Sequence, residues 1–131
     1  MINKILLISS LIILTACSSN VRNDSAFINL DPSGVKDLLN SEEDVFLLDT
    51  HIPEQQHILG MDAFIPYNEI ESNIDKLPED KSTPILVYCR SGSMSLEASQ
   101  KLVELGYENV YNLEGGANSW REAAYEFEVE K

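Results

Sequence analysis

The stretch that decides the fold is 85–95, which reads ILVYCRSGSMS. Its first four residues, Ile85 to Tyr88, are all apolar, which is typical of a parallel strand that is covered on both faces. Cys89 follows at the carboxyl end of this strand, and Gly92 lets the chain turn tightly before a helix begins. The pattern therefore places a thiol where backbone N–H groups and the positive end of a helix dipole favour a thiolate.

Short apolar runs and helical patterns alternate along the rest of the chain. The further runs predicted as strands are Phe27–Leu30, Val45–Leu48, Phe64–Pro66 and Val110–Leu113. Apolar residues at helical spacing lie between or after them: Val35, Leu38 and Leu39 behind an Asp31-Pro32 start; Ile70, Ile74 and Leu77; Ala98, Leu102 and Leu105 before a Gly106 stop; and Ala117, Trp120 and Ala124. This alternation predicts an α/β domain with a mainly parallel sheet. Ligands of such sheets bind beyond the carboxyl ends of strands, which points to Asp49 and Cys89.

The composition excludes several classes of protein. The chain has 131 residues, the size of one domain, with 44% hydrophobic and 24% charged residues. Nine basic residues stand against 22 acidic ones, for a net charge of −13, so nucleic-acid binding is not expected. Two cysteines are too few for a disulfide framework or a four-thiolate zinc site.

The N-terminal sequence has the pattern of an export signal. Residues 1–17 are MINKILLISSLIILTAC, in which Lys4 precedes a ten-residue apolar segment that is too short to span a bilayer. Leu-Thr-Ala-Cys at its end resembles the lipobox of bacterial lipoproteins. The resemblance implies cleavage before Cys17, with diacylglycerol on its sulfur and an acyl chain on its amino group. Several acyl chains give stable anchoring. The alternative is a plain secretory signal in which Cys17 is incidental.

The predicted organisation follows from this cleavage. Residues 1–16 form the signal peptide, 17–26 the lipidated cysteine and a polar tether, and 27–131 the folded domain. Ser18 after the cysteine, in place of Asp, favours the outer membrane over the inner, with the domain facing the periplasm. Removal of Lys4 changes the net charge to −14, and acylation of Cys17 leaves Cys89 as the one free thiol.

Four blocks of the sequence resemble the single-domain rhodaneses. The segment 85–95 resembles their strand-Cys-Arg-Ser-Gly-x-x-Ser-helix loop, and 47–54 resembles their "L-D-x-R-x-P-E-E" segment. Residues 57–66 resemble "H-I-P-G-A-x-x-I-P", and 107–120 resemble "G-(Y/F)-x-x-V-x-x-L-x-G-G-x-x-x-W". The blocks occur in the family's order and cover about 27–129.

The resemblance implies a rhodanese-like fold, a five-stranded parallel sheet with helices on both faces. It also implies a sulfurtransferase in which Cys89 takes a sulfane sulfur from an anion such as thiosulfate, or from a persulfide. The sulfur then passes to cyanide or a thiol, in two steps of covalent catalysis. The resemblance implies that this chemistry needs no metal and no organic cofactor. The implied substrate-binding loop is Arg90, Ser91, Gly92, Ser93, Met94 and Ser95, with Asp49 in support.

Three features depart from the family's pattern. Met94 stands where many members have Arg or another polar residue, which indicates a changed substrate preference or rate. His51 replaces the Arg of the "D-x-R" segment, so the usual ion pair with a nearby Glu is expected to weaken. The stretch from Glu54 to His57 is about three residues short. Arg90 either faces the pocket or pairs outward with a carboxylate.

Other readings of Cys89 remain open at this stage. A buried cysteine at a strand end is often structural. A phosphatase on the same fold needs Cys-x5-Arg, but Ser95 occupies the Arg position. A Cys-His-Asp hydrolase would use Cys89 with Asp49 and either His51 or His57. A non-catalytic persulfide carrier or protein-binding module is the alternative that Met94 and His51 motivate. The acidic surface should disfavour an anionic donor, so either loop amides overcome that field or the donor is neutral or carried by a protein.

Overall fold

A computed structural model describes residues 26–41 and 44–130 of the chain. They form one parallel five-stranded sheet in the order β1-β5-β4-β2-β3. The strands are β1 (Ile28–Leu30), β2 (Phe46–Asp49), β3 (Ala63–Phe64), β4 (Ile85–Tyr88) and β5 (Val110–Leu113). The helices are α1 (Pro32–Asn40), the 3₁₀ helix η1 (Glu71–Lys76), α2 (Ser93–Glu104) and α3 (Gly116–Glu122).

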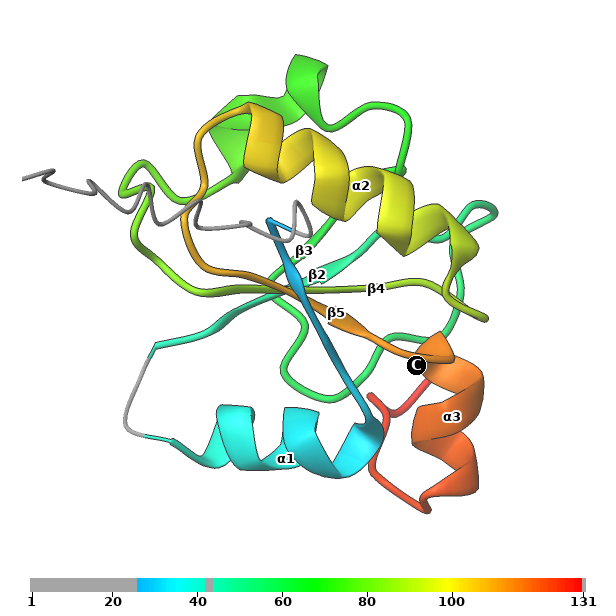
Figure 1. Ribbon diagram of the computed structural model, residues 1–131. Coiled ribbons are helices and arrows are strands. Elements are labelled where there is room, and N and C mark those ends of the chain that lie inside the picture. Colours follow the sequence, from blue (N-terminus) through cyan, green and yellow to red (C-terminus); the bar gives the residue numbers. More distant parts are fainter. Residues whose placement is uncertain (1–25, 42–43, 131) are drawn as a thin grey trace, which may run out of the picture.

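The sheet separates two layers of helices, α2 and η1 on one face and α1 and α3 on the other (Figure 1). All four side chains of β4 are buried, and they alternate between the two faces. Ile85 and Val87 pack in the core beneath α2, whereas Leu86 and Tyr88 pack in the core with Trp120 of α3. The central strand is therefore covered on both faces, and the predicted fold class is confirmed.

Local sequence signals account for where most helices begin and end. The Asp31 carboxylate accepts a hydrogen bond from the Gly34 N–H at 2.7 Å, and Pro32 occupies the first turn of α1, as the sequence predicts. Helix α2 ends at Glu104, and its C-cap Leu105 directly precedes Gly106. None of the helices in the described ranges is long and apolar enough to cross a membrane.

Two predicted helical faces are wrong in detail. The segment with Ile70, Ile74 and Leu77 is a short 3₁₀ helix, whose tighter winding turns Ile74 toward solvent at 45% exposure. Ala124 does not belong to the apolar face of α3, because the helix ends at Glu122 and Ala124 is exposed with a positive φ of 59°. The remaining apolar residues of both segments are buried as predicted, so the core is unaffected.

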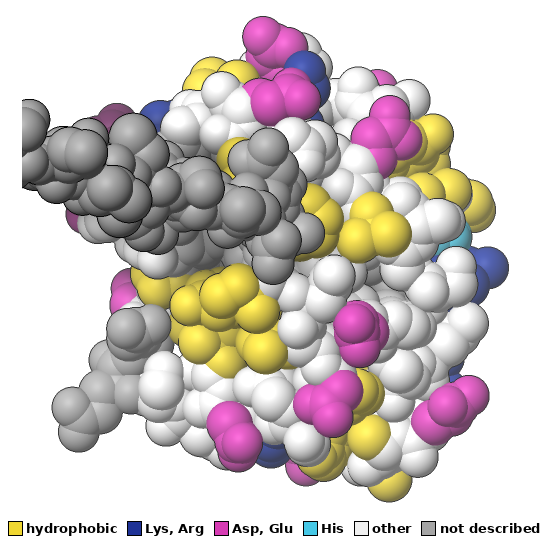
Figure 2. All heavy atoms as spheres, viewed as in Figure 1, with side chains coloured by type: hydrophobic (Ala, Val, Ile, Leu, Met, Phe, Trp, Pro, Cys, Tyr) yellow, Lys and Arg dark blue, Asp and Glu magenta, His cyan; other side chains and the backbone are white. Residues whose placement is uncertain are grey.

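The predicted signal peptide (1–16), Cys17 and most of the predicted tether lie outside the described residues. The domain from Phe27 onward is described except for 42–43 and 131. On the face shown in Figure 2, acidic side chains are spread widely and basic ones are sparse, in keeping with the net charge of −13.

Candidate active site

Cys89 lies immediately after the central strand, at the edge of the sheet where the carboxyl ends of the strands meet. The backbone N–H of Gly92 donates a hydrogen bond to Cys89 Sγ over 3.0 Å. The Ser95 hydroxyl donates to the Gly92 carbonyl at 3.0 Å and accepts from the thiol at 3.4 Å. Cys89 is 1% exposed. The sulfur therefore sits inside the turn with one backbone donor and one hydroxyl beside it.

Gly92 is the residue that makes this turn possible. Its φ of +113° is a conformation that residues with a side chain rarely adopt, and it directly precedes the first residue of α2. The turn brings the Gly92 N–H back toward the residue that ends β4. The sequence interpretation of Gly92 as the residue that permits a tight turn is confirmed.

The start of α3 forms hydrogen bonds with the backbone of the cysteine loop. Ala117 N–H donates to the Cys89 carbonyl at 2.8 Å, and Asn118 N–H donates to the Arg90 carbonyl at 3.0 Å. A Cβ on Gly116 would lie 2.5 Å from the Cys89 carbonyl oxygen. The absence of a side chain at Gly116 thus allows helix α3 to contact the cysteine loop backbone to backbone.

The other loop side chains differ in exposure. Arg90, Ser91 and Ser93 are exposed, Met94 is half-buried and Ser95 is buried. Among the described residues, Arg90 forms no ion pair with a carboxylate. The outward carboxylate pairing considered for Arg90 is therefore not seen among the described residues.

Asp49 ends the neighbouring strand β2 and is fully buried. Its carboxylate accepts hydrogen bonds from His51 N–H at 3.0 Å, from Gln55 Nε2 at 3.3 Å and from His57 Nδ1 at 2.8 Å. One of these three donors, His51 N–H, is a backbone amide of the loop that follows β2. The two side-chain partners, Gln55 and His57, are additional.

His57 bridges two carboxylates. Its Nδ1 lies 2.8 Å from Asp49 and its Nε2 lies 2.8 Å from Glu54. Burial opposes the charged imidazole, but the two carboxylates outweigh it and raise the pKa of His57 above its ordinary value of 6.5. Burial, and after it the Asp49 charge, raises the pKa of Tyr88, whose hydroxyl oxygen accepts from Ile58 N–H at 3.0 Å. This network ties the carboxyl ends of β2 and β4 to the loop that follows β2.

The geometry argues against a hydrolase that uses either histidine as a base for Cys89. Both ring nitrogens of His57 are engaged by carboxylates, and His51 Nδ1 donates to the Pro53 carbonyl at 2.7 Å. Within the described ranges, neither ring forms a hydrogen bond with the thiol. His51 was expected to weaken the ion pair with a nearby Glu. In the structure it is His57 that contacts a Glu, with its Nε2 2.8 Å from Glu54.

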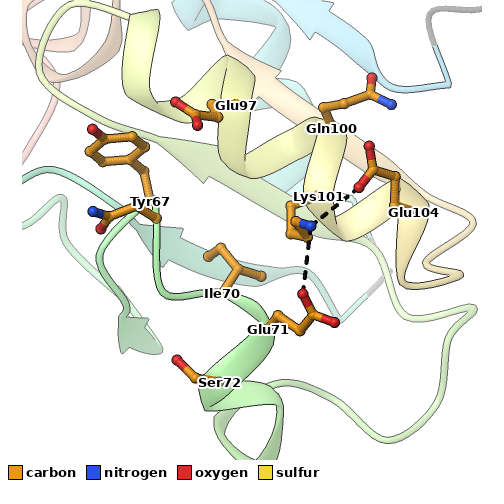
Figure 3. A pocket seen from close by; sticks show the side chains of 9 residues that line it. Tyr67, Ile70, Glu71, Ser72, Glu97, Gln100, Lys101 and Glu104 are labelled. Atoms are coloured by element: carbon orange, nitrogen blue, oxygen red, sulfur yellow. Dashed lines mark ion pairs between the residues drawn. The ribbon is translucent and has the colours of Figure 1, made fainter.

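One cavity lies away from the cysteine loop. It has a volume of about 720 Å³ and lies between η1 and α2, over Tyr67 and Ile70. Figure 3 shows Lys101 there, between Glu71 at 3.6 Å and Glu104 at 3.3 Å. A smaller hollow of about 320 Å³ borders the cysteine loop on the side of β1 and β5. No group of metal-ligating side chains is found in the parts of the chain that the structure describes.

Sequence reasoning missed one polar residue beside the loop. Asn112 lies in β5 and is only 2% exposed, with its Nδ2 donating to Asn29 Oδ1 at 2.9 Å. The signal was present in the sequence, because a residue two positions after Val110 faces the same side of the sheet, where an apolar residue is the norm. An amide side chain at this position indicates a residue that forms hydrogen bonds instead of packing in the apolar core.

The parallel sheet and the loop define the class of protein, an α/β domain that carries one thiol at the carboxyl edge of its central strand. Residues 20–123 match the rhodanese-like domain family, and the chain belongs to this family of sulfurtransferases. It is 34% identical over 109 residues to a thiosulfate sulfurtransferase GlpE of Pseudoalteromonas translucida, covering 81% of this chain and 99% of that one. It is 31% identical over 93 residues to a sulfurtransferase of Allochromatium vinosum, covering 70% and 85% of the two chains.

Solved structures show the same fold. A rhodanese-related protein from Thermoplasma volcanium superposes with a TM-score of 0.67 at 23% identity, over 79% of this chain and all of that one. A thiosulfate sulfurtransferase from Pseudomonas aeruginosa gives a TM-score of 0.67 at 29% identity, over 77% of this chain and 20% of that one. The predicted rhodanese-like domain is therefore confirmed.

Proposed function

We propose that this protein transfers a sulfane sulfur through a persulfide on Cys89. The observation that carries the proposal is the Cys89 sulfur held inside a glycine turn, with the Gly92 N–H 3.0 Å away. Hydrogen-bond donors aimed at a sulfur stabilise negative charge on it, both as the attacking thiolate and as the persulfide. The Ser95 hydroxyl, which contacts Sγ at 3.4 Å, becomes a second donor when it rotates away from the Gly92 carbonyl.

The reaction has two displacements. The Cys89 thiolate attacks the outer sulfur of a donor such as thiosulfate, an Sγ–S bond forms, and the donor's S–S bond breaks as sulfite leaves with the electron pair. An acceptor, either cyanide or a thiolate, then attacks the outer sulfur, and Cys89 leaves as the thiolate. Because the thiol is 1% exposed, a donor that presents a terminal sulfur suits the site. Cys89 supplies the nucleophile, the Gly92 N–H and the Ser95 hydroxyl supply the hydrogen bonds to sulfur, and neither step requires a cofactor.

The test compares the wild-type domain with Cys89→Ser in an assay that follows thiocyanate formed from thiosulfate and cyanide. We expect the variant to lose at least about a thousandfold in rate, as removal of a nucleophile does. Equal rates would contradict the proposal. A stable gain of one sulfur on wild-type Cys89 without turnover would instead favour the alternative function, a non-catalytic persulfide carrier or binding module.

We also propose that the protein is anchored in the bacterial cell envelope through lipidated Cys17 and faces the periplasm, with the outer membrane favoured. The support is the sequence of residues 1–17 alone. In bacterial cells, Cys17→Ala is expected to move the protein from the membrane fraction to the periplasmic fraction, because the acyl chains are lost. Unchanged fractionation, or an unmodified Cys17 by mass spectrometry, would overturn the anchor.

A further inference from the structure

Thr50 is a fully buried polar residue to which the proposed reaction gives no part. It directly follows β2, so it lies beside the end of β4, the neighbouring strand of the sheet. Its backbone N–H and its side-chain hydroxyl both donate to the Tyr88 carbonyl, each at 2.9 Å. A carbonyl oxygen has two lone pairs, so these two donors fill its hydrogen-bonding capacity. The second of them exists only because the residue at position 50 has a hydroxyl.

The Tyr88 carbonyl belongs to the peptide group that precedes Cys89. The peptide group that follows Cys89 is held as well, because the Ala117 N–H donates to the Cys89 carbonyl at 2.8 Å. Each peptide group is a rigid plane, and the two planes that meet at a Cα atom determine where its Cβ points. Thr50 on one side and Ala117 on the other therefore fix the direction of the Cys89 side chain.

The direction of the Cys89 side chain decides whether the sulfur meets its donor. The Gly92 N–H reaches Sγ at 3.0 Å. A hydrogen bond weakens steeply as its angle departs from linear, so a small rotation of the Cys89 side chain would weaken the support for a thiolate. Misplacement of a reacting atom by about 1 Å can cost roughly a hundredfold in rate. The attack on a sulfur donor is thus sensitive to the hydrogen bonds that hold the Tyr88 carbonyl.

Thr50 is itself held in place. Its own carbonyl accepts a hydrogen bond from the Tyr67 N–H at 3.0 Å, which connects it to the segment after β3. A threonine side chain is stiff about its first torsion, so the hydroxyl is oriented before any substrate arrives. A buried hydroxyl is also costly unless it has a partner, and the Tyr88 carbonyl is the partner of this one.

We propose that Thr50 is a positioning residue for Cys89. The role rests on the proposed transfer of sulfur through Cys89, and Thr50 acts on it without touching a substrate. Its hydroxyl holds the Tyr88 carbonyl, and the Cys89 sulfur is thereby aimed at the Gly92 N–H and at the incoming donor. Loss of the hydroxyl slows the attack and leaves the binding of the donor unchanged.

The first experiment measures the loading of Cys89 with sulfur from thiosulfate in a single turnover, followed by mass spectrometry. Thr50→Val keeps the shape of the side chain and removes the hydroxyl. We expect its maximal loading rate to fall about tenfold with the half-saturating thiosulfate concentration unchanged, and Thr50→Ser to stay within about threefold of wild type. A wild-type rate in Thr50→Val, failure of Thr50→Ser to restore the rate, or a change confined to the half-saturating concentration would overturn the proposal.

Tyr107→Phe is the matched control. The Tyr107 hydroxyl donates to the Pro78 carbonyl at 2.7 Å, so this variant also loses a hydrogen bond from a side-chain hydroxyl to a backbone carbonyl. Both residues precede strands, Pro78 before β4 and Tyr107 before β5, and so lie toward the end of the sheet opposite Cys89. We expect a wild-type loading rate. An equal fall in Tyr107→Phe and Thr50→Val would mean that general destabilisation explains both, and the proposal would be wrong.

The second experiment does not depend on sulfur transfer. The NMR signal of the Gly92 amide proton reports its hydrogen bond to Sγ, and we expect Thr50→Val to move it upfield while Thr50→Ser and Tyr107→Phe leave it in place. If Thr50→Val does not fold, Thr50→Ala is compared with Thr50→Ser, since both lack the methyl group and only serine has the hydroxyl. An unchanged signal in the variant without the hydroxyl would contradict the positioning role. The expected shift in a protein that never loads sulfur would retain that role and refute the proposed function.

Discussion

Two neighbouring strands end in very different surroundings. At the end of β4, Cys89 has the Gly92 N–H and the Ser95 hydroxyl as partners of its sulfur. At the end of β2, Asp49 accepts from one backbone N–H and two side chains, and His57 carries the contact on to Glu54. The Cys89 thiol has few partners, and one of them, the Ser95 hydroxyl, can rotate. Both oxygens of the Asp49 carboxylate already accept hydrogen bonds.

The contrast indicates different duties for the two chain segments. A nucleophile has to exchange partners during reaction, so surplus hydrogen bonds to its ground state would slow it. A buried carboxylate has no such requirement and needs every partner to offset its lost hydration. We therefore assign the chemistry to the β4 end and the rigidity of the site to the β2 end.

Asp49→Ala and Cys89→Ser break the comparison in opposite directions. Removal of Asp49 leaves Gln55 and His57 without their buried partner, and we expect a loss of about 3 kcal/mol in unfolding free energy. Cys89→Ser should change that free energy by less than about 1 kcal/mol while it abolishes sulfur transfer. Urea denaturation of both variants measures the difference. A Cys89→Ser protein that is as unstable as Asp49→Ala would show that the thiol is mainly structural.

Gly116→Ala tests how far the cysteine loop depends on its support. The new Cβ would lie 2.5 Å from the Cys89 carbonyl oxygen at a φ of +57°, with backbone on both sides. We expect a loss of about 3 kcal/mol in unfolding free energy, from backbone strain and the steric clash together. Gly106→Ala is the control, because its φ is +95° but nothing lies within 4 Å of the new Cβ. Equal losses in the two variants would mean that the contact between α3 and the loop contributes nothing.

The pH dependence of stability gives the smallest effect and sharpens the role of His57. Its folded-state pKa is raised above 6.5, so protonation favours the folded state. This stabilisation is complete below the pKa of the unfolded chain and is lost as pH rises through the folded-state pKa. The free-energy difference between wild type and His57→Gln should therefore be larger at pH 6 than at pH 9. Parallel pH profiles from urea denaturation would show that His57 stays neutral.

Much of the fold could be predicted because its signals are local. A run of four apolar residues and a following glycine place β4 and the loop, and Asp31-Pro32 places the start of α1. One error arose where the type of helix determines which side chains face the core. Ile74 has helical spacing from its neighbours, but a 3₁₀ helix turns it outward. Spacing alone does not distinguish the two helix types.

The position of Cys89 in its loop was predictable, and the contacts around it were less so. Cys89, Gly92 and Ser95 come from one continuous stretch, and the structure brings them together. The position of Asp49 followed from the rule on strand ends, whereas its pairing with Gln55 and His57 depends on how an irregular loop folds back. Asn112 and Asn29 are 83 residues apart and meet only because β1 pairs with β5. Contacts of that range have no local signature.

The strand order also determines when the thiol is sheltered during synthesis. Strand β1 pairs with β5 alone, and the backbone of Cys89 is held by N–H groups of α3, so the elements that enclose the sulfur are among the last to leave the ribosome. Contacts between distant segments form late in folding. A nascent chain consequently carries an unshielded Cys89 until β5 and α3 have been made. The period between synthesis and completion of the sheet is when this protein is most vulnerable to oxidants and to unwanted disulfides.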